Sequence, residues 1–393
     1  MNTFAAVVTG KGTGAIATML LFGDSAETVL REIFTPAAKR RPALKTGQVV
    51  LGTIRDATHT IDQVTIGCEG PNKFAINCHG NPLIVEAIMR LLQRHGATPV
   101  TAQELRFRIL STEKPASSIA LEAKLAMPRA KTLEGTKIIA NQTDSGLTRA
   151  GGKWLDRMDE TSLDQIKNAA AGILEASQTA KLIIEGCTVV LAGPANSGKS
   201  TLLNRLCGKE RAIVTDIKGT TRDWVSSHCK IGSLYVEFID TAGLDIEPPA
   251  PEGEIEKLSQ QKTVEILARA DLVLLVLDAA GTTEQVDVRL LERIAGRKVL
   301  TILNKSDLPA GFDAADLPEI LGQRVRLSAK TGLGIEGLLE ELPKTCGVDG
   351  FDLQRAVAFT TRQRNILKRL SKAGSKDQGR SIITELLSGT VSV

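Results

Sequence analysis

Aromatic side chains are scarce in this sequence: nine phenylalanines, two tryptophans and one tyrosine, Tyr235, make up 3% of the 393 residues. Proteins that bind single-stranded RNA by stacking bases on aromatic rings need more of these side chains, so we do not expect that mode of recognition. Charge of one sign is not in large excess either, because the formal net charge is only +4. That value permits an acidic partner without requiring one.

Paired cysteines, a leader sequence and long apolar runs are also absent. The six cysteines, at positions 68, 78, 187, 207, 229 and 346, form no CxxC pair. The start MNTFAAVVTGKG has no charged segment before an apolar core, and apolar runs such as DLVLLVLDAA are too short to cross a bilayer. We therefore expect a cytoplasmic protein without membrane association, whose cysteines are reduced and structural.

The order of expected elements divides the chain into four segments. Residues 1–114 mix short strand-like runs with one clear helix that begins at Pro82, which indicates a small α+β domain. Residues 115–185 and 347–393 are mostly helical, and the second of these parts is short. Between them, residues 186–346 alternate apolar runs with helical stretches, as in a mostly parallel sheet covered by helices. This order predicts an α/β domain inserted into an α-helical domain.

A glycine-bounded loop carries the strongest motif. GPANSGKS, residues 193–200, follows an apolar strand and precedes a helix, with the G-x-x-x-x-G-K-[ST] spacing of a P-loop. Its amides can hold phosphate, Lys199 can reach the β- and γ-phosphates, and the Ser200 hydroxyl can ligate Mg²⁺. A glycine-rich turn without function is the alternative, which the flanking strand and helix disfavour. The nucleotide-binding residues predicted in this loop are Asn196, Ser197, Gly198, Lys199, Ser200 and Thr201.

Two further phosphate-side elements follow the P-loop. Asp240 ends the strand YVEFID, where its carboxylate can hold Mg²⁺ through a water, and the Gly243 amide can meet a γ-phosphate. A threonine ligand of Mg²⁺ is expected between the P-loop and Asp240. GTTRD lies there, and we assign the ligand to Thr221, with Thr220 as the alternative.

Two motifs predict the recognition of guanine. In NKSD, Asp307 can accept the N1 and N2 protons of guanine, which adenine lacks, while Asn304 fixes the loop and the Lys305 stem covers the ring. SAK ends the run RVRLSA, and the Ala329 amide can meet guanine O6; the SAK residues are Ser328, Ala329 and Lys330. All of these motifs follow strands, and ligands bind at the carboxyl ends of strands in open α/β sheets. The order of motifs therefore predicts a guanine-nucleotide-binding domain.

IVTDIKGTTRD, together with DTAGL, NKSDL and SAKTG, resembles the tRNA-modification GTPases of the MnmE/TrmE family. The resemblance covers nearly the whole chain and is strongest over residues 187–345. It implies hydrolysis of GTP to GDP and phosphate, a folate-binding-like N-terminal domain that forms a homodimer, and a flavoprotein partner with which the wobble uridine (U34) of tRNA is modified. The alternative is a regulatory or ribosome/RNA-assembly GTPase that has lost the modification chemistry.

The glutamine that orients the attacking water in Ras-like enzymes is missing here, because Leu244 follows DTAG. The family orients this water with a glutamate in a stretch like E-V-E-R-I-G. EIEKLS matches that stretch best and nominates Glu256 as a catalytic residue beside Lys199 and Thr221. The alternative is a solvated carboxylate at a helix start, as also applies to its neighbours Glu252 and Glu254.

The resemblance also implies activation of hydrolysis by K⁺. The ion would be held by Asn196 and by backbone carbonyls of the segment after the P-loop, and it would stabilise charge developing between the β- and γ-phosphates. The residues nominated for these carbonyls are Thr215, Ile217 and Thr220.

The chain departs from the family pattern at both ends. The family's C-terminal cysteine motif has no match in SIITELLSGTVSV, and we expect Cys346 to be structural. The family's Y-T-G-E-D loop is absent from GPNKFAINCHG, and its Gly-Arg-Gly-Gly turn corresponds to Gly10–Gly14. Lys11 there lacks the planar fork of arginine, and a further family lysine corresponds to Lys114. A tetrahydrofolate derivative as cofactor is therefore expected only with altered contacts.

Residues 351–372 are expected to be helical, and RAVAFTTRQRNILKRLSKA (355–373) has the clearest helical pattern. A basic stretch lies here, between Gln354 and Arg380. It has one acid, Asp377, and eight basic residues: Arg355, Arg362, Arg364, Lys368, Arg369, Lys372, Lys376 and Arg380. Such runs commonly form a solvated helix face, and the functional alternative is contact with tRNA phosphates. A second basic run is formed by Lys39, Arg40, Arg41 and Lys45.

Overall fold

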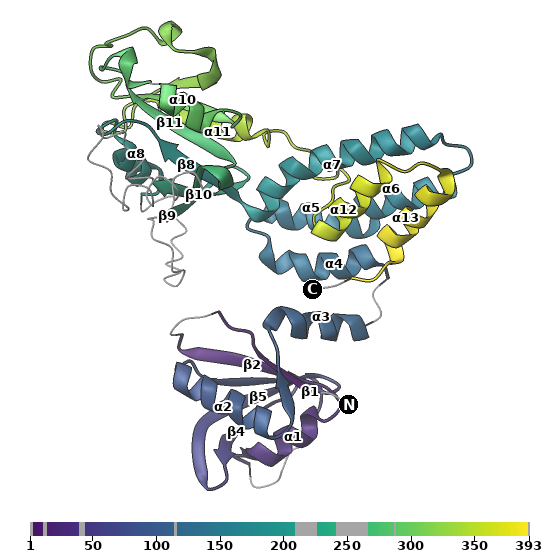
Figure 1. Ribbon diagram of the computed structural model, residues 1–393. Helices are drawn as coiled ribbons and strands as arrows, with labels where there is room; N and C mark the ends of the chain where they lie inside the picture. The colour runs from purple at the N-terminus through teal and green to yellow at the C-terminus, as the bar shows by residue number, and fades with distance from the viewer. Residues whose placement is uncertain are drawn as a thin grey trace, which may run out of the picture. The chain divides into compact units, whose positions relative to one another are not determined.

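The computed structural model describes residues 3–10, 14–38, 44–113, 116–208, 226–240, 266–286 and 288–391. The chain divides into two compact units, with the boundary between Ala116 and Ser117 (Figure 1). Over the described ranges, none of the helices combines the length and apolar character that a bilayer crossing requires.

The N-terminal unit contains a seven-stranded sheet in the order β3-β4-β5-β6-β2-β1-β7. Neighbouring strands are antiparallel except for the parallel pair β1 and β7. The strands are β1 Thr3–Val7, β2 Ile16–Phe22, β3 Phe34–Pro36, β4 Val49–Asp56, β5 His59–Gly70, β6 Lys73–His79 and β7 Ala97–Pro99. Helices α1 (Ala26–Ile33) and α2 (Pro82–Arg94) pack their apolar residues against one face of this sheet.

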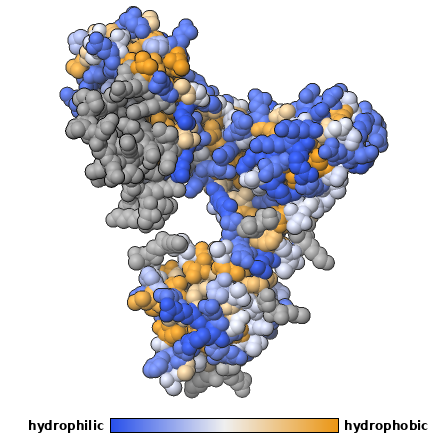
Figure 2. All heavy atoms as spheres, viewed as in Figure 1, coloured by the Kyte–Doolittle hydropathy of each residue, from blue (hydrophilic) through white to orange (hydrophobic). Residues whose placement is uncertain are grey.

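Helix α2 begins at the proline that the sequence indicated. Pro82 occupies the first turn, where a missing N–H costs nothing, and the Asn81 side chain accepts a hydrogen bond from the Leu83 amide at 2.9 Å. The other sheet face is only partly covered, by α3 (Ala102–Thr112). Strand alternation places Ile16 and Leu51 on that face, at 65% and 49% exposure, and Figure 2 shows hydrophobic surface on this unit.

The second unit contains a six-stranded sheet in the order β13-β12-β11-β8-β10-β9, parallel except for β10 and β9. Strands β11 and β12 are apolar almost throughout and buried, because helices or loops cover both faces. The strands are β8 Cys187–Ala192, β9 Ser226–Ile231, β10 Leu234–Asp240, β11 Leu272–Asp278, β12 Val299–Asn304 and β13 Gln323–Arg326. The accompanying helices are α8 Lys199–Leu206, α10 Val288–Ile294 and α11 Ile335–Cys346.

The last strand of this sheet is shorter than the run RVRLSA indicated. Strand β13 ends at Arg326, although the Leu327 amide still donates to the Leu303 carbonyl at 3.0 Å. The Ser328 amide instead donates to the Leu333 carbonyl at 2.8 Å, which turns the chain away from the sheet. SAK therefore lies in the loop after the strand.

Six helices of the second unit pack beside one another, and α7 contacts α12 although the whole sheet lies between them in sequence (Figure 1). Ser162 and Gln165 form a capping box at the start of α7, and Gly186, at φ 95°, ends it. These helices are α4 Ser118–Ala126, α5 Leu133–Asp144, α6 Gly146–Asp156, α7 Leu163–Glu185, α12 Thr361–Leu370 and α13 Lys376–Ser388. Short 3₁₀ turns occur at Met127–Arg129, Thr283–Gln285, Ala314–Asp316 and Glu319–Leu321.

The prediction of a helix over residues 351–372 was wrong at its start, since α12 begins only at Thr361. The preceding backbone bonds to other helices instead of to itself. The Val357 amide donates to Gln142 Oε1 at 3.1 Å, and the Ala358 amide donates to Ser177 Oγ at 2.7 Å. These tertiary bonds override the local helical pattern.

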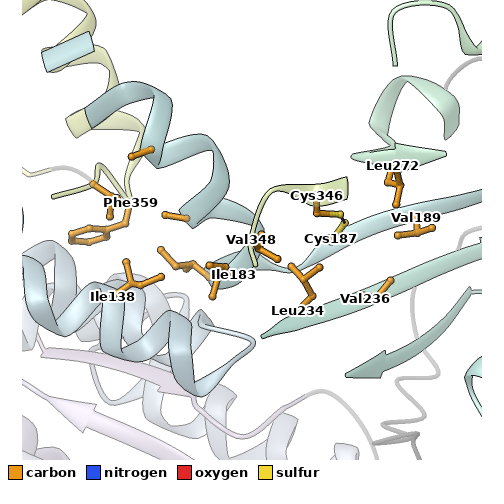
Figure 3. Packing of buried hydrophobic residues seen from close by; sticks show 14 of the residues in the cluster. Ile138, Ile183, Cys187, Val189, Leu234, Val236, Leu272, Cys346, Val348 and Phe359 are labelled. Atoms are coloured by element: carbon orange, nitrogen blue, oxygen red, sulfur yellow. Dashed lines mark hydrogen bonds between the residues drawn. The ribbon is translucent and has the colours of Figure 1, made fainter. Parts of the chain in front are cut away.

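One hydrophobic core runs from the helices into the six-stranded sheet (Figure 3). Ile183 at the end of α7 and Val348 after α11 belong to it together with Leu234 of β10. Cys187 and Cys346, where the chain enters and leaves the sheet region, are both buried with their Sγ atoms 3.7 Å apart. The helices and the sheet of this unit are thus joined by continuous packing at the two chain crossings.

Candidate functional site

The loop between β8 and α8 has the backbone that a phosphate cradle needs. Gly193 (φ 138°) and Gly198 (φ 95°) adopt conformations that favour glycine, and Asn196 also has a positive φ of 61°. A Cβ on Gly193 would lie 2.1 Å from the Val276 carbonyl oxygen, so no larger residue fits there. Lys199 is 6% exposed, and its Nζ donates to the carbonyls of Gly193 at 3.0 Å and Pro194 at 2.9 Å.

Ser200 and Asp240 come together beside this loop. The Ser200 hydroxyl donates to Asp240 Oδ2 at 2.8 Å, although the two residues lie on different elements, α8 and β10. The second carboxylate oxygen, Oδ1, is buried without a hydrogen-bond partner among the described residues. A hydroxyl and a carboxylate oxygen left open are hard oxygen donors of the kind that Mg²⁺ selects, so this pair fits the predicted magnesium site.

Asn304 joins the P-loop to the SAK loop. It is 2% exposed; its Nδ2 donates to the Ser197 carbonyl at 2.7 Å, and its Oδ1 accepts from the Ala329 amide at 2.9 Å. A Cβ on Gly198 would lie 2.2 Å from Asn304 Nδ2, so this close approach also depends on glycine. The two motifs therefore form one rigid framework.

Asp307 lies on the surface of the same framework. A hydrogen bond from Ser328, with help from the nearby charges of Lys330 and Lys305, holds the pKa of the Asp307 carboxyl below its usual 3.8. The carboxyl group therefore stays ionised near neutral pH, and only the ionised form can accept hydrogen bonds from both the N1 and N2 N–H groups of guanine. Lys305 has a positive φ of 61°, and its Nζ contacts Asp278 Oδ2 at 2.6 Å.

These motifs surround one cavity of about 590 Å³. It brings together eleven of the predicted nucleotide-binding residues, while Ser197 and Asp240 lie outside its lining. Ser197 is 1% exposed, and its hydroxyl has no partner among the described residues. The lining consists of Asn196, Gly198, Lys199, Ser200, Thr201, Asn304, Lys305, Asp307, Leu308, Ser328, Ala329 and Lys330.

Several predicted residues lie outside the described part of the chain. On the phosphate side these are Thr215, Ile217, Thr220, Thr221, Gly243, Leu244 and the three glutamates Glu252, Glu254 and Glu256. In the N-terminal unit they are Lys11, Lys39, Arg40, Arg41 and Lys114. Their roles therefore remain predictions.

Two residues with contacts in the site were not predicted. Asp278 ends the strand LVLLVLD just as Asp240 ends YVEFID, and that parallel could have identified it as a partner of Lys305. Arg205, in the last turn of α8, donates to the carbonyls of Ala329 and Lys330. No local pattern marks Arg205, because its partners lie in a loop more than a hundred residues away in sequence.

The basic stretch is partly neutralised by acids that are distant in sequence. Arg362 makes two bonds to the buried Glu122, with Nη2 2.7 Å from Oε2. Arg369 pairs with Glu385 at 2.8 Å, and Arg380 pairs with Asp159 at 3.1 Å. Three of the eight basic residues of this stretch are therefore engaged by acids within the fold. The basic residues without an acidic partner in the described part of the chain are Arg355, Arg364, Lys368, Lys372 and Lys376, of which Lys376 donates to the Asp159 carbonyl.

The N-terminal glycines at the expected folate turn border a separate cavity. Gly10 and Gly14 line a mostly apolar space of about 780 Å³ together with Glu86 and Met89. Gly80 must be a glycine here, since a Cβ would lie 1.9 Å from the Gly14 carbonyl oxygen. The cavity carries a carboxylate and no described cation, which is a poor match to an anionic ligand.

Known proteins resemble this chain over different lengths. A family model described as 50S ribosome-binding GTPase matches residues 188–305. The tRNA modification GTPase MnmE of Endomicrobium trichonymphae is 29% identical over 437 residues, covering 100% of this chain and 93% of that protein. The MnmE protein of Nitratidesulfovibrio vulgaris strain DP4 is 31% identical over 371 residues, covering 86% of this chain and 80% of that protein.

Among solved structures, the G domain of the Thermotoga maritima FeoB iron transporter is 28% identical, covering 40% of this chain and 98% of that chain with a TM-score of 0.31. The full-length relatives extend the likeness well beyond the GTPase segment, from the N-terminal unit to the C-terminal helices. The P-loop, NKSD and SAK motifs surround one cavity, as a GTPase requires. Because its identity to these relatives extends over most of its length, the chain belongs to the MnmE family of tRNA modification GTPases.

Proposed function

We propose that this chain binds GTP in the cavity between the P-loop, NKSD and SAK, hydrolyses it to GDP and phosphate, and acts in the modification of the tRNA wobble uridine. The observation that carries the proposal is that residues of all three motifs line one cavity. Family membership adds tRNA modification as the process in which the hydrolysis is used.

On the phosphate side, Lys199 exchanges its two P-loop carbonyls for the β- and γ-phosphates when GTP binds. The Ser200 hydroxyl and the Asp240 carboxylate, which lie together, would hold Mg²⁺ with Thr221. When bound, this ion neutralises charge on the phosphates. The Gly243 amide meets the γ-phosphate.

On the base side, Asp307 accepts the N1 and N2 protons of guanine and so excludes adenine. The Lys305 stem covers one face of the ring, while its ammonium pairs with Asp278. Asn304 keeps the P-loop and the SAK loop at a fixed separation, because it bonds to both.

For the hydrolytic step, Glu256 replaces the glutamine of Ras-like enzymes and orients the attacking water. Asn196, with carbonyls of Thr215, Ile217 and Thr220, would hold K⁺, which would supply positive charge to the developing transition state. The positive φ of Asn196 and its place in the cavity lining support this role.

We infer the following organisation for the whole chain. Residues 186–346 form the GTPase domain, inserted into a helical domain made of residues 115–185 and 347–393; the contact of α7 with α12 supports this. Residues 1–114 form a folate-binding-like domain through which the chain dimerises. The chain acts in the cytoplasm with a flavoprotein, and exposed lysines such as Lys368 contact tRNA phosphates. A tetrahydrofolate derivative binds only if Lys11 supplies the cation that the described cavity lacks.

The test combines two measurements. GTP hydrolysis by the purified chain is compared in K⁺ and in Na⁺, with faster turnover expected in K⁺. Total tRNA from a deletion strain is analysed by mass spectrometry, with loss of the wobble-uridine modification expected. Turnover without any change in the nucleoside profile would instead favour a regulatory or ribosome-assembly GTPase, and absence of GTP turnover in both salts would refute the proposed activity.

A further inference from the structure

Arg205 ties the helix that begins the phosphate site to the loop that borders the base site. Its Nε donates to the Ala329 carbonyl at 3.1 Å, and its Nη2 donates to the Lys330 carbonyl at 2.5 Å. The planar guanidinium therefore donates hydrogen bonds to the carbonyls of two consecutive residues. Close to it, Gly332 has φ 93°, a backbone conformation that favours glycine.

The bond from Arg205 to the Ala329 carbonyl fixes the orientation of the whole peptide group, which includes the N–H of Lys330. In a planar trans peptide, the N–H of the following residue points away from the carbonyl oxygen. The Lys330 N–H is therefore directed away from Arg205, and Lys330 is part of the cavity lining. Within the described chain this N–H donates to no other group, whereas the Ala329 N–H is engaged by Asn304 Oδ1.

We propose that Arg205 is a positioning residue for guanine: it orients the Lys330 amide toward the exocyclic O6 of the base. The inference rests on the proposed function, because it assumes that GTP or GDP occupies this cavity. It assigns the bond to O6 to the Lys330 amide, since the Ala329 amide that the sequence suggested is already bonded within the protein.

The competing explanation is purely structural. Arginine in the last turn of a helix is favourable beside the helix dipole, and two bonds to carbonyls stabilise any loop. That explanation predicts loss of stability without a change in the choice between bases. The test must therefore measure base selectivity at position 6, which loop stability alone does not alter.

The experiment compares the affinities of GDP and 6-thio-GDP by calorimetry for the full chain and its variants. Sulfur accepts hydrogen bonds weakly, so the wild type should favour GDP by about fivefold, the value of one hydrogen bond. R205A should lose about fivefold in GDP affinity but less than about twofold for 6-thio-GDP, so the ratio falls toward one. N204A, an exposed substitution on the same helix, should leave both affinities and their ratio unchanged.

Three results would count against the proposal. If the ratio of GDP affinity to 6-thio-GDP affinity is the same in R205A as in the wild type, including the case where both affinities fall by the same factor, Arg205 only supports the loop. If R205A does not fold, R205K carries the comparison, because an ammonium cannot span both carbonyls with a planar fork and should give an intermediate ratio; a wild-type ratio in R205K overturns the inference. A wild-type chain that binds no GDP would refute the proposed function itself, which is a distinct outcome.

Discussion

The two halves of the nucleotide cavity differ in what their polar groups already contact. In the base half, Asn304 bridges two loops and Asp307 is hydrogen-bonded by Ser328. In the phosphate half, Lys199 donates to the carbonyls of Gly193 and Pro194 with two of its three N–H groups, so contact with both phosphates requires it to give up at least one of these bonds. The polar groups of the base half are thus held in place by the protein itself, whereas the phosphate half must exchange bonds when phosphate is bound.

This difference indicates where affinity and selectivity come from. A preorganised base half adds selectivity at little cost, because no side chain has to be ordered on binding. The phosphate half gains only the difference between bonds to phosphate and bonds to its own carbonyls. A carbonyl offers the Lys199 ammonium only a dipole, whereas a phosphate offers an opposite charge, so that difference still favours phosphate. Substitutions in the two halves should therefore have distinct signatures.

The largest effect is expected for Lys199→Ala in the phosphate half. The variant loses a charge-assisted contact to two phosphates, so GDP and GTP affinity should fall by at least about a hundredfold, measured by calorimetry. Lys344→Ala removes an exposed lysine outside the cavity and should bind GDP like the wild type. Circular dichroism checks that K199A is folded, and undiminished GDP affinity in a folded K199A would refute the assignment.

The next effect concerns base identity and should leave phosphate binding intact. In Asp307→Asn the amide donates where the carboxylate accepted, so GTP affinity should drop by roughly ten- to a hundredfold. The affinity for xanthosine triphosphate should rise, because the 2-oxo group of xanthine can accept a hydrogen bond from the new amide. The matched control, Asp349→Asn, changes an exposed carboxylate away from the cavity. A D307N variant that still prefers GTP over xanthosine triphosphate would contradict the role of Asp307.

The phosphate and base motifs could be identified from the sequence because each is local. GPANSGKS and NKSD place their functional atoms through backbone geometry within a few residues, and the positive φ of Asn196 and Lys305 is part of that geometry. The mostly parallel sheet expected within residues 186–346 could also be predicted, because uninterrupted apolar runs such as those of β11 and β12 suit strands buried on both faces.

What the sequence could not predict depends on contacts between distant segments. Arg205 acts through carbonyls in the SAK loop, and Glu122 neutralises Arg362 from another helix. The start of α12 is set by Gln142 and Ser177, side chains of helices that precede the sheet. No periodicity within a window of residues contains such partners, so charge counts and helical patterns gave an incomplete description of residues 351–380.

A smaller effect tests whether the P-loop also serves the chemical step. If Asn196 holds K⁺, then Asn196→Ala should lower turnover in K⁺ by roughly tenfold through loss of charge stabilisation, while GDP affinity changes little. The rate in Na⁺ should be nearly the same in both proteins. Asn204→Ala, an exposed substitution on α8 outside the cavity lining, is the comparison variant. Equal stimulation by K⁺ in wild type and N196A would remove Asn196 from the proposed site.

The smallest effect is expected at the junction of the two halves. Ser197 contributes its carbonyl to Asn304, but its buried hydroxyl has no partner among the described residues. A buried polar group without a partner costs stability, so Ser197→Ala should raise the free energy of unfolding by about 1 kcal/mol, measured by urea denaturation, while GDP affinity stays within about twofold. Ser200→Ala is the contrast, because that hydroxyl bonds Asp240 and should be needed for Mg²⁺-dependent binding. A marked loss of GDP affinity in S197A would show that the hydroxyl contacts the nucleotide. Ser197 would then belong to the phosphate half, whose bonds change on binding, and not to the junction.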